Sequence, residues 1–372
     1  MTVQKSTLAS GKVRYRARVA ANGRYVASKV FERKSDAVAW EQDQLRRLRR
    51  GEWVDPQRGK VTLAFVADSW LQTRMSVKRR TRETDELNWR AYIAPKLGQR
   101  AISSLTTAEV SEWAASLVAD GKAASTAKRA LATLRSVLAH AVADDRLIRN
   151  VASTATAPRG RDRREGQALT LAEVENLARA ARGPYADMIV ILAHTGIRWG
   201  ELAGLQVGDR VSVPAAGLRL QRAVLASSGS GELFVDALKN YRSRTIPLTP
   251  RAAHIVATWA GDRAPAEWLF ASPLGTALAE RNWKRMVGWT QAKQAIGRPT
   301  IRVHDLRHTA ASVWLAQGAD PKVVQRILGH ASATMTMDLY GHLMDANLWD
   351  AARGFVDISW TPDQKGQEAL DA

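Results

Sequence analysis

In the N-terminal part of the chain, the pattern of apolar and polar residues is first typical of β-strands and then of a helix. Residues 12–19 alternate basic and apolar side chains, as expected of a strand with one buried face. The pair Asn22-Gly23 predicts a tight hairpin turn, and residues 24–31 supply the returning strand. A helix is then expected over residues 35–50, capped by the serine that opens it and ended by the following glycine. These elements predict a small α+β domain over residues 1–59.

From residue 61 to residue 151 the apolar positions recur every three or four residues, the period of a helix packed on one side. Thr106 and Glu109 have the spacing of a capping box and mark the start of one helix. We expect a helical domain with basic edges over residues 60–152. Its four helices should cover residues 63–71, 78–95, 107 onward and 125–143.

Residues 153–168 are rich in Ser, Thr, Ala, Pro and Arg without apolar periodicity, which predicts a basic linker. Beyond it, Thr170 is placed to cap a helix, and residues 185–195 are apolar enough for a buried helix. We predict a mostly helical domain over residues 169–360 and a loose polar tail over residues 361–372. Within that domain, strands are expected at residues 217–224, 232–238 and 244–248.

The charge of the chain indicates a polyanionic partner. Lys and Arg number 55 against 36 Asp and Glu, a formal net charge of +19. Phosphates neutralised by such side chains release counterions, which favours nucleic acid as the partner. A basic protein from a GC-rich, Arg-rich genome would have the same composition, and charge alone does not separate the two.

The composition also excludes several classes of protein. Cysteine is absent, so a disulfide scaffold, a thiolate nucleophile and a Cys-bound zinc site are excluded. The first residues contain no apolar run typical of a signal peptide, and no stretch is long enough to span a bilayer. We therefore expect a soluble intracellular protein with no membrane partner.

Two separated motifs carry side chains suited to a phosphodiester. Arg198 follows the bend at Thr195-Gly196, and Glu201 lies one turn later, where it can orient a partner. His304 and Arg307 share one face of a helix farther along the chain. Arginine binds two phosphate oxygens at once, and histidine transfers protons near neutral pH. A lone arginine after a bend is more often structural. The two motifs together therefore indicate a phosphate site more strongly than either motif alone.

The second motif also allows a metal-site interpretation. His304 and His308 have the spacing of a zinc protease, with Asp305 where that motif carries Glu. The shorter acid is unsuited to the base role, and Arg307 would place a cation beside the metal. We therefore expect neither a metal ion nor another cofactor.

The C-terminal part adds a candidate nucleophile. Tyr340 follows the Leu328-Gly329-His330 motif, although a lone tyrosine more often serves packing. A phenol has an unperturbed pKa of about 10, so nearby cations are needed to favour the phenolate and to stabilise a five-coordinate phosphorane. Lys239 lies at the end of an expected strand. It is a solvated charge unless that hairpin leans over the site, where it could protonate a leaving alkoxide.

Several exposed basic residues are candidates for DNA contact, with an ordinary solvated face as the alternative. They lie on the first strand, before the second helix of the helical domain, and on its fourth helix: Arg14, Arg16 and Arg18; Lys78, Arg79 and Arg80; Lys128 and Arg129.

Taken in order, these motifs resemble the tyrosine recombinases, the integrase family of temperate phages and mobile elements. Residues 195–202 match the first arginine box, and residues 238–248 look like the β-hairpin that carries the family lysine. Residues 304–309 are similar to the second box, and residues 328–330 with Tyr340 fit the last one. Each box alone is weak, whereas all of them in this order are specific.

The resemblance covers the whole chain and implies a fold. The helical region looks like the core-binding domain of that family, and the N-terminal unit looks like the arm-binding domain of phage integrases. We expect a mainly α multidomain protein: a small α+β N-terminal domain, a helical core-binding domain and a mixed α/β catalytic domain, mostly helical with a small antiparallel sheet. The arm-binding domain is absent from the shorter recombinases that resolve chromosome dimers, which favours an integrase.

The resemblance also implies a mechanism. Tyr340 attacks a DNA phosphate to give a 3′-phosphotyrosine, with His304 assisting proton transfer and Lys239 acting as the general acid for the 5′-oxygen. Arg198 and Arg307 clamp the non-bridging oxygens. Two further residues complete the implied site: His330 hydrogen-bonds the phosphate, and Glu201 positions the pocket.

The partners implied by the family are double-stranded attachment sites, a homotetramer on DNA, a Holliday-junction intermediate, a host DNA-bending factor and an excision directionality factor. Neither ATP nor metal is needed, and the implied place of action is the cytoplasm and nucleoid of a bacterial host. The alternatives are a type IB topoisomerase, a Xer-like resolvase and a DNA-binding regulator that keeps the fold. The intact set of boxes argues against the regulator.

Overall fold

The computed structural model describes residues 3–8, 10–21, 24–49, 55, 57–160, 166–238 and 243–329. The chain divides into two compact units, Met1–Arg163 and Arg164–Ala372. Most of the described chain is helical, with three small antiparallel sheets, which confirms the predicted fold class. None of the described helices is both long enough and apolar enough to cross a membrane.

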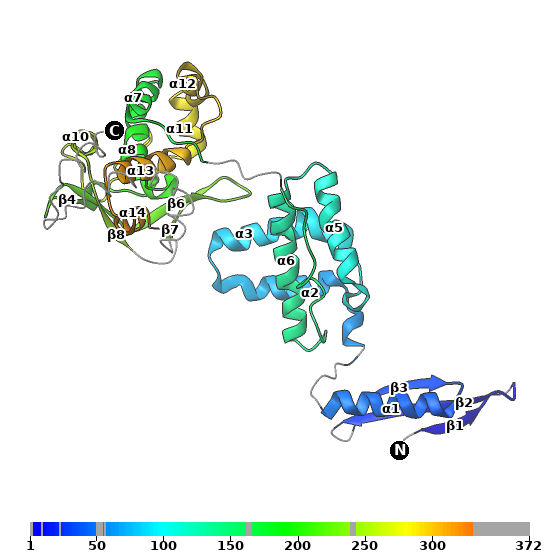
Figure 1. Ribbon diagram of the computed structural model, residues 1–372. Coiled ribbons are helices and arrows are strands. Elements are labelled where there is room, and N and C mark those ends of the chain that lie inside the picture. The colour runs from blue at the N-terminus through cyan, green and yellow to red at the C-terminus, as the bar shows by residue number, and fades with distance from the viewer. Residues whose placement is uncertain are drawn as a thin grey trace, which may run out of the picture. The chain divides into compact units, whose positions relative to one another are not determined.

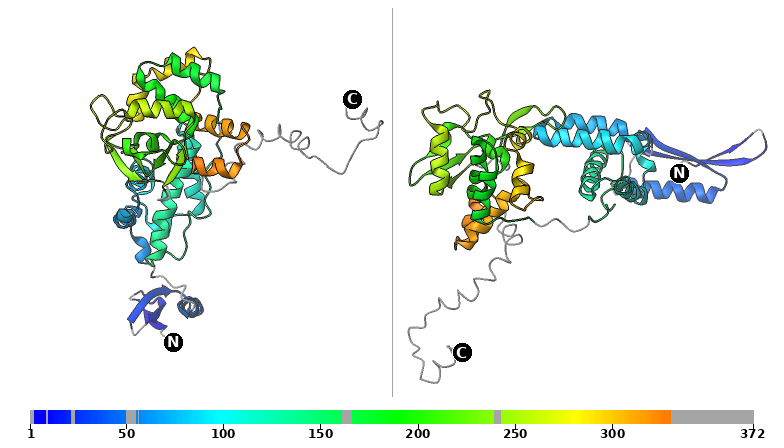
Figure 2. Two further views of the ribbon diagram at one scale, coloured as in Figure 1. Left: turned by 90° about the vertical axis from the view of Figure 1, so that its left-hand side faces the viewer. Right: turned by 90° about the horizontal axis from the view of Figure 1, so that it is seen from above.

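The N-terminal part is a three-stranded sheet with one helix on it (Figures 1 and 2). The strands are β1 (Gln4–Thr7), β2 (Val13–Ala21) and β3 (Arg24–Phe31), with β2 in the middle and both pairs antiparallel; the helix is α1 (Lys34–Arg49). Ala17 and Val19 on β2 are buried, as is Ala37 on α1. Alternation along β2 therefore reflects one face under the helix, as the sequence predicts.

Two details of this region differ from expectation. The strand β1 is not predicted by the sequence pattern, because all four of its side chains are exposed and leave no apolar alternation to detect. The helix begins at Lys34, so Ser35 lies inside its first turn, with its hydroxyl 3.3 Å from Asp36 Oδ1, and is not the preceding cap. The turn at Asn22-Gly23 and the stop at Gly51 lie outside the described residues.

The rest of the first unit is a helical bundle around one core. Its helices are α2 (Leu63–Thr73), α3 (Arg79–Asn88), α4 (Ala94–Leu97), α5 (Thr107–Ala119) and α6 (Ala124–Ala143), and a π-helical turn, Trp89–Ile93, joins α3 to α4; short 3-10 turns cover Arg58–Lys60, Arg74–Ser76 and Ile102–Ser104. The capping box of Thr106 and Glu109 is confirmed, with backbone-to-side-chain bonds of 3.3 and 3.0 Å. The apolar face of α6, including Leu131, Leu134 and Leu138, is buried.

The segment after α6 packs on this bundle before the chain leaves it. Ala152 and Ala155 belong to the buried core, and Arg135 donates hydrogen bonds to the carbonyl oxygens of both. The helical spacing of α6 predicts that Arg135 faces outward, opposite the apolar stripe. That prediction is wrong, because the returning segment supplies carbonyl acceptors that a pattern of helical spacing does not show.

The second unit is built around α8 (Asp187–Thr195), whose residues are almost all buried. It packs against α7 (Leu171–Ala180), α10 (Pro250–Ala260) and α13 (Asp305–Ala316) (Figure 1). Thr170 caps α7, and most of residues 185–195 are buried, as predicted. The remaining helices are α9 (Trp199–Ala203), α11 (Glu280–Met286), α12 (Trp289–Ala295) and α14 (Pro321–Leu328), with 3-10 turns at Pro184–Ala186 and Val207–Asp209.

The strands of this unit form two sheets. One contains β4 (Arg210–Val211), β5 (Gly217–Leu220) and β8 (Arg244–Pro247), and the other contains β6 (Arg222–Ala226) and β7 (Leu233–Ala237). The single strand expected at residues 217–224 is thus two strands, which divide at Gln221. Its side chain and that of Arg222 both bind the buried Asp209. In consequence β7 pairs with β6 and β8 pairs with β5, so the expected β7–β8 hairpin is wrong.

Candidate active site

Arg198 owes its position to the turn at the end of α8. That helix ends at Gly196, which has a left-handed φ of +65°, a conformation that favours glycine. A side chain there would also crowd Ala310 of α13, whose Cβ would lie 3.0 Å away. Arg198 then stands immediately before α9, with its side chain 33% exposed. The predicted bend is confirmed, and it leaves a fixed arginine at the surface of the unit.

Glu201 holds this arginine from one turn farther along. Its carboxylate accepts hydrogen bonds from the Arg198 backbone N–H at 2.9 Å and from Arg198 Nη1 at 3.0 Å. The side chain is only 4% exposed. Burial acts to raise the pKa of Glu201, but the hydrogen bonds and charge of Arg244, together with Arg198, outweigh it and lower the pKa below its ordinary value. Glu201 is therefore ionised at neutral pH.

Arg244, on β8, is the second partner of this carboxylate, and no sequence motif selects it as a site residue. Its Nη1 and Nη2 donate to the two oxygens of Glu201 at 3.0 and 2.7 Å, and its Nε donates to the Ile327 carbonyl at 3.0 Å. The side chain is 15% exposed. One sequence signal could have selected it. Arg244 stands two positions before the buried Ile246 on the same strand, so the two side chains point to the same face of β8.

Arg307 approaches the same turn from α13. Its Nη1 donates to the Gly196 carbonyl at 2.6 Å, and the residue is buried. The start of α13 is fixed by Asp305, which is buried and accepts hydrogen bonds from the backbone and side chain of Arg302 at 2.6–3.0 Å. Arg307 and Arg198, which are far apart in sequence, are thus brought to the same turn.

His304 immediately precedes α13, close to these cations. Loss of hydration lowers the pKa of its imidazole, and the positive charges of His308, Arg307 and, to a lesser extent, Arg198 lower it further. His304 is therefore neutral at pH 7 and able to accept a proton. The rings of His304 and His308 lie 5.4 Å apart. Among the described residues, no group of three or more His, Asp or Glu side chains is arranged to hold a metal ion.

The end of α14 closes the site. Gly329 caps this helix in a left-handed conformation, with φ of +69°, and its carbonyl lies 3.4 Å from Arg198 Nη2. The structure thus places the residue before His330 against Arg198. Lys239, His330 and Tyr340 themselves lie outside the described residues.

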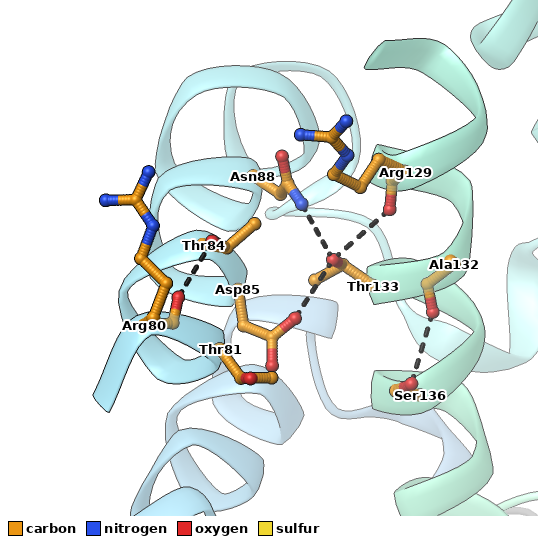
Figure 3. A pocket seen from close by; sticks show the side chains of 9 residues that line it. All are labelled: Arg80, Thr81, Thr84, Asp85, Asn88, Arg129, Ala132, Thr133 and Ser136. Carbon is orange, nitrogen blue, oxygen red and sulfur yellow. Dashed lines mark hydrogen bonds between the residues drawn. The ribbon is translucent and has the colours of Figure 1, made fainter. Parts of the chain in front are cut away.

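The helical bundle carries a polar groove between α3 and α6, shown in Figure 3. Asp85 and Asn88 point toward Thr133, whose Oγ1 accepts a hydrogen bond from Asn88 at 3.0 Å and lies 3.3 Å from Asp85 Oδ1. The guanidinium group of Arg80 extends away from this network. The groove has a volume of about 300 Å³ and is lined by Arg80, Thr81, Thr84, Asp85, Asn88, Arg129, Ala132, Thr133 and Ser136.

Two of the predicted DNA-contact residues, Arg80 and Arg129, therefore line one groove, and both are exposed. Lys128 is exposed beside Arg129, and Arg79 is exposed and pairs with Glu83 at 3.0 Å. Lys78 directly precedes α3 and is half-buried.

The three predicted arginines of the N-terminal sheet occupy every second position of β2, and the buried Ala17 and Val19 follow Arg16 and Arg18. Arg14 pairs with Glu32, Arg16 is exposed and Arg18 is half-buried. Since Ala17 and Val19 are buried on the alternate positions, the arginines occupy the opposite face.

Comparison with known proteins agrees with this geometry. The Phage integrase family profile matches residues 167–347, and the Phage integrase central domain profile matches residues 63–157. The integrase of Mycobacterium phage L5 is 30% identical over 329 residues, which cover 84% of this chain and 86% of that protein. A XerC-like tyrosine recombinase of Caldanaerobacter subterraneus is 24% identical and covers 96% of this chain and 100% of its own length.

Solved structures share the fold. The Tn1549 transposon integrase in complex with circular intermediate DNA has a TM-score of 0.67 at 22% identity, covering 78% of this chain and 99% of that one. A lambda integrase tetramer bound to a Holliday junction has a TM-score of 0.55 at 19% identity, covering 89% of this chain and 96% of that one. With both profiles matched and the L5 integrase similar over most of its length, the chain belongs to the phage integrase family of tyrosine recombinases.

Proposed function

We propose that the protein is a site-specific integrase that cuts and rejoins double-stranded DNA, and so inserts or excises a phage or mobile element. The observation that carries the proposal is the meeting of Arg198, Arg307 and the end of α14 around one turn. Two arginines from distant segments of the chain thus lie at one turn, and Arg198 lies close to Gly329, the residue before the predicted site residue His330. Fixed cations of this kind stabilise the charge that develops on a phosphate under attack.

In the proposed reaction the Tyr340 oxygen forms a bond to the DNA phosphorus, and the bond from phosphorus to the 5′-oxygen breaks. The tyrosine proton passes to His304, whose lowered pKa keeps it neutral and able to accept it. Lys239 supplies a proton to the leaving 5′-oxygen. The 5′-hydroxyl of a partner strand then attacks the phosphotyrosine and releases Tyr340, so one phosphoester replaces another without an external energy source.

We assign the two arginines to the non-bridging oxygens of that phosphate. Arg198 is partly exposed, and Arg307 donates to the Gly196 carbonyl in the turn just before Arg198. The two cations are therefore close enough to neutralise charge on one phosphate in the transition state. His330 follows Gly329 and is proposed to donate a further hydrogen bond. Glu201 does not touch DNA in this scheme, but holds the Arg198 side chain.

DNA binding is assigned to three successive domains: residues 1–59 on arm-type sites, residues 60–152 on the core site and residues 169–360 on the scissile phosphate. The groove between α3 and α6 supports the second assignment, because the exposed Arg80 and Arg129 line it. Polar side chains between two cations can contact both base edges and phosphates. Deleting residues 1–59 should abolish binding to arm-type sites alone; unchanged binding to every site would contradict the first assignment.

We further propose that the protein acts as a tetramer on paired sites through a Holliday junction, the assembly in which the lambda integrase was solved. A host DNA-bending factor and an excision directionality factor are the expected accessory proteins. The bacterial cytoplasm, at the nucleoid, is the proposed place of action.

A Xer-like resolvase is the nearest alternative, since XerC proteins of mycobacteria also match this chain. Those matches cover 67–69% of the chain, against 84% for the L5 integrase. A type IB topoisomerase would reseal the same strand and relax supercoiled plasmid without a second site. Efficient relaxation of such a plasmid would favour that alternative.

The direct test is Tyr340→Phe. Wild type should form a covalent DNA adduct that survives denaturation, and sequencing the attached DNA would identify the core site. The variant should form none while binding DNA with nearly unchanged affinity, because only the nucleophilic oxygen is removed. An adduct that persists in Tyr340→Phe would contradict the assignment of the nucleophile.

A further inference from the structure

The Glu201 carboxylate binds two arginines, Arg244 and Arg198, which differ in their exposure and in their hydrogen bonds to the rest of the protein. Arg244 directs three nitrogens inward, two to Glu201 and one to the Ile327 carbonyl, and is 15% exposed. Arg198 is 33% exposed, and its contact with the Gly329 carbonyl is long, at 3.4 Å. Arg198 is thus the arginine oriented for a ligand, whereas the guanidinium of Arg244 is occupied by the protein.

Arg244 also fixes the end of α14. The last carbonyls of a helix carry partial negative charge and need donors, which Arg244 supplies at Ile327. Its guanidinium lies so close to Gly329 that a Cβ at that position would be 2.9 Å from Arg244 Cζ. The left-handed φ of Gly329 and this close approach both require glycine immediately before His330.

The Arg244 guanidinium therefore joins three segments that are far apart in sequence. Arg244 itself lies on β8, Glu201 belongs to the first arginine box, and Ile327 lies at the end of α14. Figure 1 shows β8 and α14 in the same part of the second unit, and the two elements are in contact. Without Arg244, the buried carboxylate of Glu201 would be left with Arg198 as its charged partner. Glu201 would then hold Arg198 more tightly and compete with the phosphate for its donors.

We propose that Arg244 is a positioning residue for DNA cleavage: it shares the charge of Glu201 and fixes the end of α14, so that Arg198 and the segment leading to Tyr340 reach the phosphate together. This inference rests on the proposed function. It predicts an effect on the rate of cleavage more than on DNA affinity. It also predicts that lysine substitutes for Arg244 only in part. A lysine supplies the positive charge, but its single ammonium group cannot donate to both Glu201 oxygens and to the Ile327 carbonyl in the same geometry.

The test compares Arg244→Gln and Arg244→Lys with wild type on a duplex carrying the core site recovered from the Tyr340 adduct. Adduct formation is followed at saturating protein, DNA affinity is measured separately, and thermal unfolding reports the folded fraction. Because small misplacement of reacting groups lowers rates about 100-fold, we expect a loss of about that size for Arg244→Gln, with an intermediate rate for Arg244→Lys. DNA affinity should change by less than about threefold, since the guanidinium is turned away from the ligand.

Arg222→Gln is the matched control. Arg222 lies on β6, is 23% exposed and binds the buried Asp209 at 2.6 Å, so its substitution also removes a partly buried ion pair from the same unit. It does not bind Glu201 in the described structure. Below its unfolding temperature this control should cleave at close to the wild-type rate.

A double-mutant cycle with Glu201→Gln tests the route of the effect. If Arg244 acts through Glu201, the two substitutions together should slow cleavage by much less than the product of their separate effects. Wild-type cleavage by Arg244→Gln, a loss no larger than that of Arg222→Gln, or fully multiplicative effects would each overturn the inference alone. Absence of any adduct in wild type would instead overturn the proposed function, and this inference with it.

Discussion

Two carboxylates, the buried Glu201 and the half-buried Asp85, organise polar networks in the two units, and the two networks differ in what they hold. Glu201 in the catalytic unit binds two arginines, one of which stays partly exposed beside the end of α14. Asp85 in the helical bundle binds Arg74 at 2.8 Å and lies near Thr133, and the exposed Arg80 and Arg129 line the same groove. The first network holds Arg198, the arginine that we propose binds the scissile phosphate. The second joins α3 to α6 beside these two exposed cations.

The reason for the difference is the precision that each task needs. Transition-state stabilisation depends on donors held at set distances. Arg198 and Arg307, to which we assign this role, are held at one turn by hydrogen bonds to Glu201, Gly329 and Gly196. Counterion release by phosphate binding depends on charge near the backbone and tolerates mobile side chains. Substitutions in the two networks should therefore change different measured quantities.

The largest effect is expected from Arg307→Ala. Removing one fixed donor to a developing oxyanion lowers rates by about 10²–10³-fold, so adduct formation should fall by that factor at saturating protein. DNA affinity should fall much less, because the exposed basic residues remain. Arg251→Ala removes an arginine that is 48% exposed and pairs with Glu175, and it should cleave normally. Equal loss of cleavage in both variants would show that the site depends on total charge and not on fixed geometry.

An intermediate effect is expected on stability from Thr133→Val, which leaves Asn88 and Asp85 without the hydroxyl between them. A buried polar group that loses its partner destabilises a protein by about 1–3 kcal/mol, and the free energy of unfolding of the helical bundle should fall by that amount. Ser136→Ala removes an exposed hydroxyl that bonds only within its own helix, to Ala132, and should change it by less than about 0.5 kcal/mol. Equal stability of the two variants would mean that the Asp85 network does not fix the helices.

The smallest effect is expected from the double variant Lys128→Ala, Arg129→Ala. Each side chain that neutralises one phosphate contributes about 0.9 to the slope of log affinity against log salt, so removing both should reduce the slope by about 1.8. Cleavage at saturating protein should be unchanged, because neither residue belongs to the catalytic unit. Lys96→Ala, an exposed lysine on α4 that does not line the groove, is the control and should leave the salt slope unchanged. A normal salt slope with slowed cleavage would reverse the roles that we assign to the two regions.

Much of the fold follows from local rules. The capping box at Thr106, the N-cap at Thr170, the bend at Gly196 and the apolar run through α8 are all where the sequence predicts them, because each depends on neighbouring residues alone. The strands of the catalytic unit were less predictable. Their division at Gln221 depends on Asp209, which binds Gln221 and Arg222 from a separate turn and so sends consecutive strands into different sheets.

The same distinction applies to the site. Sequence alone predicted Arg198, Glu201, His304 and Arg307 as site residues, because they stand in motifs with a fixed order. It proposed the basic residues of α3 and α6 as DNA contacts by their charge. Only the tertiary structure decided that Arg244 shares the Glu201 carboxylate and reaches the end of α14, or that Arg135 turns inward to hold residues after its own helix. A charged side chain satisfies its hydrogen bonds with whatever acceptors the fold brings to it, and those acceptors lie on segments that no local pattern connects.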